Sequence, residues 1–314
     1  MTICWRLATS SYCPEYAALA DSIQCKSSEY LYFVIMFTAY FLIICINSTI
    51  VCLIVIHKNL HEPMYIFIAA LLINSVLYST NIYPKLLIDF LSEKQIITHS
   101  LCLFQGSVHY TMAGSEFSLL SAMAYDRYLS ICKPLQYATI MRKTVVIVFL
   151  VLAWFVPTCE LGVLVALYAN IKLCSFTLKG IFCNTSFYNL QCVRSVTISI
   201  YGLFMLLNIV LFPVLFIFFT YTRILIASYR SSKTFRRKAA QTCLPHLLVL
   251  INLTFFITYD VIVVRLESDI PNTTHLIMAL QMIVYHPLFN PIIYGLKMKE
   301  ISKHLKRLFQ VKSH

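Results

Sequence analysis

The side chains that could do chemistry begin with an acid–arginine pair, Asp126 and Arg127, at the end of a long apolar run. A charged pair is costly in hydrocarbon, so this position indicates either a function or an anchor for the end of a helix. His109, Glu116 and Arg127 are spaced by seven and then eleven residues. Eighteen residues complete five helical turns, so the three side chains share one face. We therefore predict a helix whose titratable groups face a bundle interior or a cavity.

The sequence lacks the motifs of common enzyme classes. It has no phosphate-binding loop, no dinucleotide fingerprint and no G-x-S-x-G elbow. Its 12 cysteines are scattered, and none has the C-x-x-C spacing of a metal site. We interpret Cys45, Cys52 and Cys159, which lie in apolar runs, as small buried hydrophobic residues. We expect no enzymatic activity, no cofactor and no metal.

The composition indicates which kind of secondary structure carries these charged side chains. The chain has 314 residues, of which 59% are hydrophobic and 12% are charged, whereas soluble domains carry roughly 25% charged residues. Six glycines, and the lack of alternating ten-residue segments, argue against a membrane β-barrel. We predict an all-α membrane protein.

Seven apolar runs are each long enough to cross a bilayer as a helix. We predict a seven-transmembrane helix bundle (30–296), preceded by an extracellular N-terminus (1–29) without a signal peptide and followed by a cytoplasmic amphipathic helix and tail (297–314). The predicted spans are about Tyr30–Ile56, Met64–Leu91, Leu101–Ile131, Thr144–Leu167, Ser195–Thr222, Thr242–Val264 and His275–Leu296.

The basic residues predict the orientation. With the N-terminus outside, seventeen of the 25 Lys and Arg residues lie on the cytoplasmic side and eight lie outside. The net charge of +12 then suits anionic membrane lipid, so no nucleic-acid partner is expected. After the last span, Ile301, Leu305 and Leu308 share a face, which predicts a helix along the inner membrane surface. A solvated basic tail is the alternative.

Several motifs carry a resemblance to a known family. Asp126-Arg127-Tyr128 at the end of the third span and Asn290-Pro291-Ile292-Ile293-Tyr294 in the seventh are similar to motifs of rhodopsin-like G-protein-coupled receptors. The chain further resembles vertebrate odorant receptors in Pro63-Met64-Tyr65, in Met123–Cys132 and in Lys238-Ala239-Ala240-Gln241-Thr242-Cys243 with His246. It departs from them in having Ser75 in place of an aspartate and Thr254 in place of a tyrosine.

The resemblance implies a receptor at the plasma membrane that binds a small-molecule odorant from outside and activates a heterotrimeric G protein of the stimulatory type. Asp126 and Arg127 would hold the resting state, and Arg127 would be released when the sixth helix moves outward. The residues implied in activation and coupling are Glu116, Asp126, Arg127, Tyr128, Arg237, Lys238, His246, Asn290, Pro291 and Tyr294.

The resemblance places the ligand among the third, fifth, sixth and seventh spans. His109 stands where amine receptors carry an aspartate, so a cationic amine would lack its usual counter-ion. Arg265 offers a partner for an anionic ligand, unless it reaches water or pairs with Asp260, Glu267 or Asp269. Asp260 and Glu160 lie inside apolar runs and are either functional or hydrated. The expected ligand contacts, for each of which helix packing is the alternative role, are His109, Tyr110, Ala113, Gly114, Met205, Leu206, Ile209, Ile257, Thr258, Val261 and Arg265.

The resemblance also pairs Cys102 with Cys183, and Cys174 with Cys192. Four cysteines alone leave the connectivity open, and Cys4, Cys13 and Cys25 are possible competitors. Sequons at Asn184 and Asn272 predict glycosylation on the outer side.

Two alternatives to an odorant receptor are a rhodopsin-like receptor for a non-odorant ligand and a channel or transporter. The odorant-type motifs at Pro63 and Lys238 argue against the first. Inverted repeats and broken helices, typical of transporters, are missing from the sequence.

Overall fold

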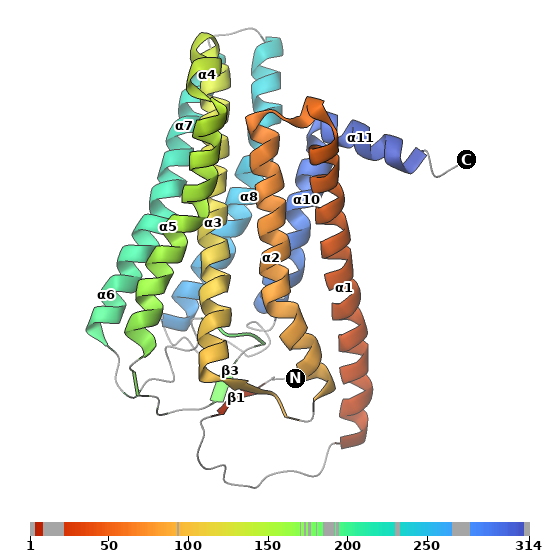
Figure 1. Cartoon of the computed structure of the whole chain (residues 1–314), viewed down its shortest axis with the longest axis vertical. Helices are drawn as coiled ribbons and strands as arrows, with labels where there is room; N and C mark the ends of the chain where they lie inside the picture. The colour runs from red at the N-terminus through yellow and green to blue at the C-terminus, as the bar shows by residue number, and fades with distance from the viewer. Residues whose placement is uncertain are drawn as a thin grey trace.

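A computed structural model describes residues 4–8, 22–92, 94–169, 171–172, 174, 177–179, 181–184, 192, 195–229, 233–265 and 277–310. Over these residues the chain is a bundle of long helices with a small sheet at one end, in agreement with the predicted all-α membrane bundle (Figure 1). The helices are α1 (Ser22–Ile56), α2 (Pro63–Leu91), α3 (His99–Cys132), α4 (Pro134–Ile140), α5 (Lys143–Ala169), α6 (Val196–Met205), α7 (Phe212–Tyr229), α8 (Lys233–Arg265), α10 (His286–Lys297) and α11 (Lys299–Gln310). Shorter segments are η1 (Lys58–Leu60), η3 (Leu206–Leu211) and η4 (Gln281–Tyr285).

Six membrane spans are recognisable among the described helices by length and hydropathy alone. The predicted third span, α3, is the exception, because its polar residues lower its hydropathy. This helix lies in the middle of the bundle, in contact with α2, α5, α7 and α8. Its neighbours shield it from lipid, so it can carry the buried Glu116 and Asp126.

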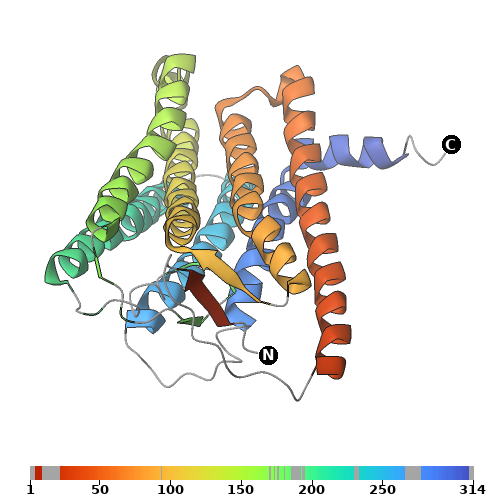
Figure 2. The same ribbon diagram turned by 60° about the horizontal axis from the view of Figure 1, so that its bottom comes forward.

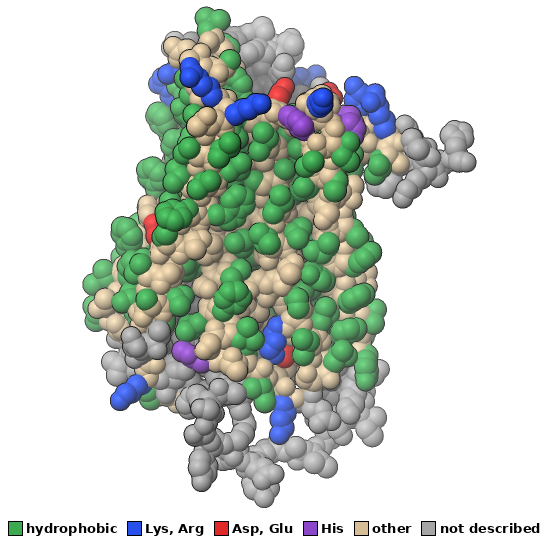
Figure 3. Space-filling model, viewed as in Figure 1, with side chains coloured by type: hydrophobic (Ala, Val, Ile, Leu, Met, Phe, Trp, Pro, Cys, Tyr) green, Lys and Arg blue, Asp and Glu red, His purple; other side chains and the backbone are tan. Residues whose placement is uncertain are grey.

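The outward faces of the bundle are apolar. Phe41 on α1, Phe155 on α5 and Phe218 on α7 are exposed, and hydrophobic side chains are spread over the face of the bundle shown in Figure 3. This surface matches a helix bundle whose solvent is hydrocarbon. Cys45, Cys52 and Cys159 belong to the same surface. The prediction that they are buried is therefore wrong, since apolar side chains in a membrane protein can face lipid as well as the core.

A three-stranded sheet lies at the end of the bundle opposite α4 and α11 (Figures 1 and 2). Strand β1 (Cys4–Ala8) pairs in parallel with β2 (Ile96–Thr98) and antiparallel with β3 (Thr177–Lys179). The sequence did not predict these strands. Helix α1 also begins at Ser22, earlier than the predicted start at Tyr30, because the hydropathy of a span marks the hydrocarbon boundary and a helix can continue beyond it.

Polar side chains join neighbouring helices inside the bundle. The amide of Asn74 donates to the Met112 carbonyl at 2.9 Å, and the Trp154 indole donates to Asn74 Oδ1 at 3.2 Å. The Asn47 amide donates to the Pro287 carbonyl at 3.1 Å. Such bonds fix helix positions where no hydrophobic effect drives the helices together.

Helix α11 runs away from the bundle at the end where Lys and Arg side chains gather (Figures 1 and 3). Ile301 is buried, whereas Lys303, Lys306 and Arg307 are exposed, as predicted for an amphipathic helix. His304 is buried against His57, with ring centroids 3.9 Å apart, and the Asn59 amide donates to His304 Nε2 at 3.2 Å. The two histidines therefore attach α11 to the segment that follows α1.

Acid is expected to loosen this attachment. Burial and the neighbouring His57 lower the pKa of His304 from its ordinary value of 6.5, so protonation favours the undocked helix. The stabilisation is therefore fully present above about pH 6.5 and is lost as the pH falls through the lowered pKa. Hydrogen exchange of α11 in the purified protein, corrected for intrinsic rates, should increase several-fold on acidification. His304→Phe, which keeps a ring but cannot be protonated, should remove this dependence; an unchanged pH profile in that variant would contradict the assignment.

Candidate functional site

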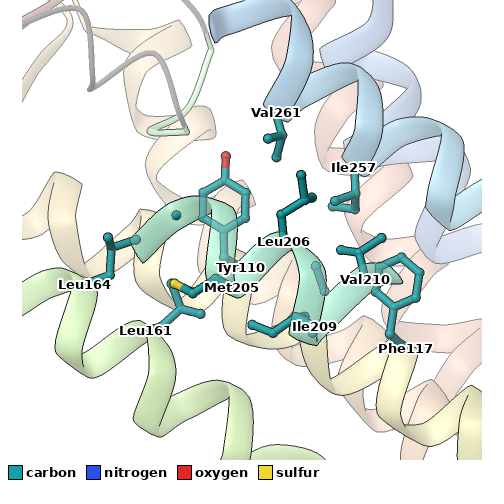
Figure 4. Close-up of a pocket in the computed structure, with 13 residues that line it drawn as sticks. Tyr110, Phe117, Leu161, Leu164, Met205, Leu206, Ile209, Val210, Ile257 and Val261 are labelled. Carbon is teal, nitrogen blue, oxygen red and sulfur yellow. The ribbon is translucent and has the colours of Figure 1, made fainter. Parts of the chain in front are cut away.

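A cavity with an empty volume of about 630 Å³, part of it open to solvent, lies between α3, α5, α6, η3 and α8 (Figure 4). Its lining is apolar except for the phenol of Tyr110. The lining residues are Tyr110, Ala113, Gly114, Phe117, Leu161, Leu164, Gly202, Met205, Leu206, Ile209, Val210, Ile257 and Val261. Such a cavity suits a small molecule with a largely apolar body.

Two local features of the chain shape the walls of this cavity. Segment η3 is a π-helical turn just before Pro213, which has no N–H for the preceding turn, and it brings Leu206, Ile209 and Val210 to the cavity. On α3, Gly114 lets the neighbouring elements approach closely. A Cβ atom at this glycine would lie 2.9 Å from Ile209 Cγ2 and 3.0 Å from Pro157 Cβ.

Most of the predicted ligand contacts line this cavity. From α3 these are Tyr110, Ala113 and Gly114, and the remainder are Met205, Leu206, Ile209, Ile257 and Val261. Thr258 is half-buried and is not part of the lining. The side chain of Arg265 lies outside the described residues. Whether any of these residues contacts a ligand stays a prediction.

His109, a predicted ligand contact, lies on the inward stripe of α3 but does not line the larger cavity. It is fully buried among Tyr78, Tyr110 and Phe182, with ring centroids 5.3, 4.7 and 5.0 Å away. Neither of its ring nitrogens has a hydrogen-bond partner among the described residues. The stripe was assigned correctly to the helix interior, but one helix face is wide enough to serve both the cavity and an aromatic cluster.

A loop segment, 181–184, is tied to the N-terminal end of α3. Cys102 and Cys183 form a disulfide with 5.4 Å between their Cα atoms, and the Cys183 N–H donates to Gln105 Oε1 at 3.0 Å. Cys174 and Cys192 form the second disulfide. Both predicted pairings are confirmed, while the side chains of Cys4, Cys13 and Cys25 lie outside the described residues.

An acidic group joins this loop to α3 and α8. The Tyr110 hydroxyl donates to Asp260 Oδ2, and the Asn184 amide donates to Asp260 Oδ1 at 2.7 Å. Asp260 is only 7% exposed. A glycan on Asn184 would be attached to the same amide nitrogen that donates to Asp260 and would leave it one N–H. Glycosylation at Asn184 and at Asn272, outside the described residues, stays a prediction.

Glu116 is the centre of a buried polar network beneath the cavity. His286 Nε2 donates to Glu116 Oε2 at 2.9 Å, and the Asn290 amide donates to Glu116 Oε1 at 2.7 Å and to Ser75 Oγ at 3.3 Å. The Asn252 amide donates to His286 Nδ1 at 3.4 Å. The network thus connects α2, α3, α8 and α10.

A smaller cavity lies beside the network, with an empty volume of about 250 Å³, part of it open to solvent. Glu116 and His286 line it, and it shares Ala113 and Ile257 with the larger cavity. The two cavities therefore have two wall residues in common, so a change in the packing of either residue affects both.

The C-terminal end of α3 holds the predicted acid–arginine pair. Arg127 Nε donates to Asp126 Oδ2 at 2.9 Å, and the Tyr137 hydroxyl donates to Asp126 Oδ1 at 2.8 Å. Asp126 is fully buried. The hydroxyl of Tyr294 and Nδ1 of His246 are 3.4 Å apart, which joins α10 to α8.

Other predicted activation residues are placed as follows. Tyr128 is half-buried and packs against the main core, Pro291 is buried in α10, and Arg237 is exposed near the N-terminal end of α8. The side chain of Lys238 lies outside the described residues.

Three residues were not predicted from the sequence to be partners of the buried acids. His286 lies one helical turn before Asn290, a spacing that places both on one face and was available as a signal. Tyr137 and Asn184 gave no signal of an acidic partner. Tyr137 lies on α4, in a different helix from Asp126, and Asn184 lies 76 residues before Asp260. Within the part of the chain that the structure describes, no cluster of three or more His, Cys, Asp or Glu side chains could hold a metal ion.

Comparison with known proteins gives a consistent result. A family model described as olfactory receptor matches residues 36–312. Olfactory receptor 11A1 from Homo sapiens is 33% identical over 291 residues, covering 90% of this chain and 90% of the relative. Olfactory receptor 4M1 from Mus musculus is 28% identical and covers 91% of each chain. The crystal structure of squid rhodopsin covers 97% of this chain and 90% of its own, with a TM-score of 0.70 at 15% identity. The last likeness concerns the fold alone.

Proposed function

Because this chain belongs to the olfactory receptor family, we propose that it binds a small odorant from the outer side of the plasma membrane and thereby activates a heterotrimeric G protein of the stimulatory type. The family and the fold it shares with squid rhodopsin describe a multi-pass membrane receptor rather than an enzyme. The ligand class, the G-protein type, the membrane and the outside N-terminus are part of the proposal.

The observation that carries the proposal is the position of the apolar cavity directly above the Glu116 network. A ligand changes a conformational equilibrium only through its different affinity for the two states. A ligand that packs against Ala113 and Ile257 differently in the two states would bias the contacts of Glu116 with His286 and Asn290 as well. These contacts join helices that a receptor must move to signal.

The inner surface suits the proposed protein partner and the lipid. Exposed cations gather at the inner end of the bundle, where α4 and α11 lie (Figure 3). They include Lys58, Lys133, Arg142, Lys143, Arg223, Arg237, Lys297 and Lys303. This charge favours an anionic lipid surface on the cytoplasmic side and supports the predicted orientation, with Arg127 beneath the surface as the group to be released.

The test is a cAMP assay in cells that express the full chain with a surface tag. Matched panels of short-chain acids, amines, esters and alcohols should include at least one compound that raises cAMP. The response should disappear in cells that lack the stimulatory α subunit. Silence to the whole panel at confirmed surface expression would contradict the proposal, and a ligand-evoked current in the deficient cells would favour a channel.

Gly114→Ala is expected to shift the response toward smaller ligands. The new methyl group would press on the Pro157 ring, which cannot rotate away, so overpacking should cost roughly 1–3 kcal/mol and reduce the cavity. Dose–response curves for a homologous ligand series, with melting of the purified protein, would measure both effects. Gly162→Ala is the matched control, since a Cβ atom there meets nothing within 4 Å. An equal response of both variants would contradict the role of Gly114.

A further inference from the structure

We infer that the ligand is an alcohol whose apolar body fills the larger cavity and whose hydroxyl group reaches the smaller one, where Tyr78 and Glu116 bind it. This inference deepens the proposed function and rests on it for the signalling readout, whereas binding can be measured without a G protein. Its physical basis is a buried hydroxyl that takes no part in the hydrogen bonds around Glu116.

This buried hydroxyl belongs to Tyr78 on α2. Tyr78 is 5% exposed, and its ring lies 5.3 Å from the His109 ring and 6.1 Å from the His286 ring, measured between centroids. Its hydroxyl has no hydrogen-bond partner among the described residues, and a buried unpaired hydroxyl costs free energy. Since Tyr78 lines the smaller cavity, a molecule bound there can supply the partner. His109 also has ring nitrogens without a described partner, but it is not among the residues that line either cavity.

Among the other polar residues of the smaller cavity, Glu116 has hydrogen-bonding capacity left. Both ring nitrogens of His286 are engaged, Nε2 with Glu116 Oε2 at 2.9 Å and Nδ1 with the Asn252 amide at 3.4 Å. Each Glu116 oxygen accepts one hydrogen bond, from His286 or from Asn290, whereas a carboxylate offers about four lone-pair sites. A ligand in the smaller cavity therefore meets one acceptor, the Glu116 carboxylate, and the Tyr78 hydroxyl.

An alcohol matches these two groups. Its O–H donates to Glu116 and its oxygen accepts from Tyr78, so the polar groups of both molecules are paired. An ether or a ketone can accept from Tyr78 but brings a lone pair toward the Glu116 carboxylate. An ammonium group cannot accept the Tyr78 proton, and it carries three N–H donors into a cavity whose other walls include Leu253 and Phe256. A carboxylate ligand would bring a like charge to Glu116.

The ligand would span the two cavities at the wall residues that they share, Ala113 and Ile257. In Figure 4, Ile257 lies near Val210, on the opposite side of the larger cavity from Leu164. Ala113 contributes only a methyl group, and the Ile257 side chain can rotate about χ2 between staggered positions to admit a hydroxyl. A ligand held in this way touches the Glu116 network itself, so its binding can bias the network without relying on packing alone.

The test applies ligands of similar size to the purified full-length receptor in a thermal-shift assay and to receptor-expressing cells in a cAMP assay. 1-Hexanol can donate and accept, its isomer methyl pentyl ether can only accept, and 1-chlorohexane forms at most weak hydrogen bonds. 1-Hexanol should stabilise the receptor at concentrations about tenfold lower than its isomer, which lacks the bond to Glu116. Hexylamine and hexanoic acid should bind more weakly than 1-hexanol.

Tyr78→Phe keeps the ring and removes the hydroxyl. The variant should bind 1-hexanol about tenfold more weakly, whereas 1-chlorohexane should bind as before and thereby show that the cavity is intact. Tyr40→Phe is the matched control, because the Tyr40 hydroxyl lies 3.2 Å from Thr80 Oγ1 and Tyr40 is not among the residues that line either cavity. It should leave the binding of every ligand unchanged. If Tyr78→Phe does not fold, the comparison of 1-hexanol with its isomer on the original chain still decides.

The outcomes separate the two proposals. Binding of 1-hexanol that depends on Tyr78, without a cAMP response, would reject the signalling proposal and keep the ligand class. Binding of and cAMP responses to the amine or the acid, stronger than those to 1-hexanol and unchanged in Tyr78→Phe, would reject the ligand class and keep the receptor function. Equal binding of 1-hexanol and its isomer, or an affinity for 1-hexanol that Tyr78→Phe leaves unchanged, would also reject the ligand class.

Discussion

Arg127→Ala is expected to reduce ligand-evoked cAMP to the level of cells without the receptor. Arg127 lies near the C-terminal end of α3 and donates to the fully buried Asp126. In the proposed mechanism Arg127 leaves Asp126 when the sixth span, α8, moves outward. Alanine removes the cation that must be released, so signalling should fail at the step after ligand binding. The cAMP response, normalised to surface tag, measures this loss.

Folding must be controlled in this experiment, because the substitution leaves a buried carboxylate with one fewer partner. Breaking a buried ion pair costs about 3–5 kcal/mol, which can lower surface expression. Asp126→Asn provides the opposite change: it keeps the shape and the Tyr137 hydrogen bond but weakens the hold on Arg127. It should raise basal cAMP. Full signalling by Arg127→Ala, or an unchanged basal level in Asp126→Asn, would contradict the restraint.

The sequence predicted best those features that depend on one helix at a time. Periodicity placed His109, Glu116 and Arg127 on one face of α3, where His109 and Glu116 are buried, and hydropathy located most of the spans. Tyr110, Ala113 and Gly114 followed from the same stripe. These predictions succeed because the 3.6-residue period relates neighbouring positions of one helix regardless of what lies opposite.

The features that it missed depend on two or more elements. The Glu116–His286 contact joins residues 170 positions apart, and the Tyr110–Asp260 contact joins residues 150 positions apart. Hydropathy marked Asp260 as unusual in an apolar run, but it could not show that Tyr110 and Asn184 bind it rather than water. Segment η3 could not be predicted for a related reason. The composition of Leu206–Leu211 is that of any apolar helix, although the π-helical turn shifts the register of all the side chains that follow it.

The Glu116 network is expected to behave as one unit, and a double-mutant cycle can measure this. Glu116→Leu removes the acceptor of both His286 and Asn290 and leaves buried donors unpaired, at about 1–3 kcal/mol each. A loss of about 3 kcal/mol corresponds to a fall in melting temperature of roughly 6–12 °C, taking about 2–4 °C per kcal/mol for a large domain. Melting of the purified receptor in a fixed detergent and lipid mixture gives the values.

His286→Leu should cost less than Glu116→Leu, because Glu116 keeps its bond from Asn290. The variant with both leucines should melt higher than the sum of the two losses predicts, because it no longer holds an unpaired histidine against leucine. Coupling of residues in contact is typically about 0.5–3 kcal/mol, whereas distant sites add within about 0.5 kcal/mol. Glu160→Leu, combined with His286→Leu, is the matched additive control. Simple additivity for Glu116 and His286 would mean that their contact carries no shared energy. The cavity would then act on the inner end through apolar packing alone, and the route through the polar network would have to be abandoned.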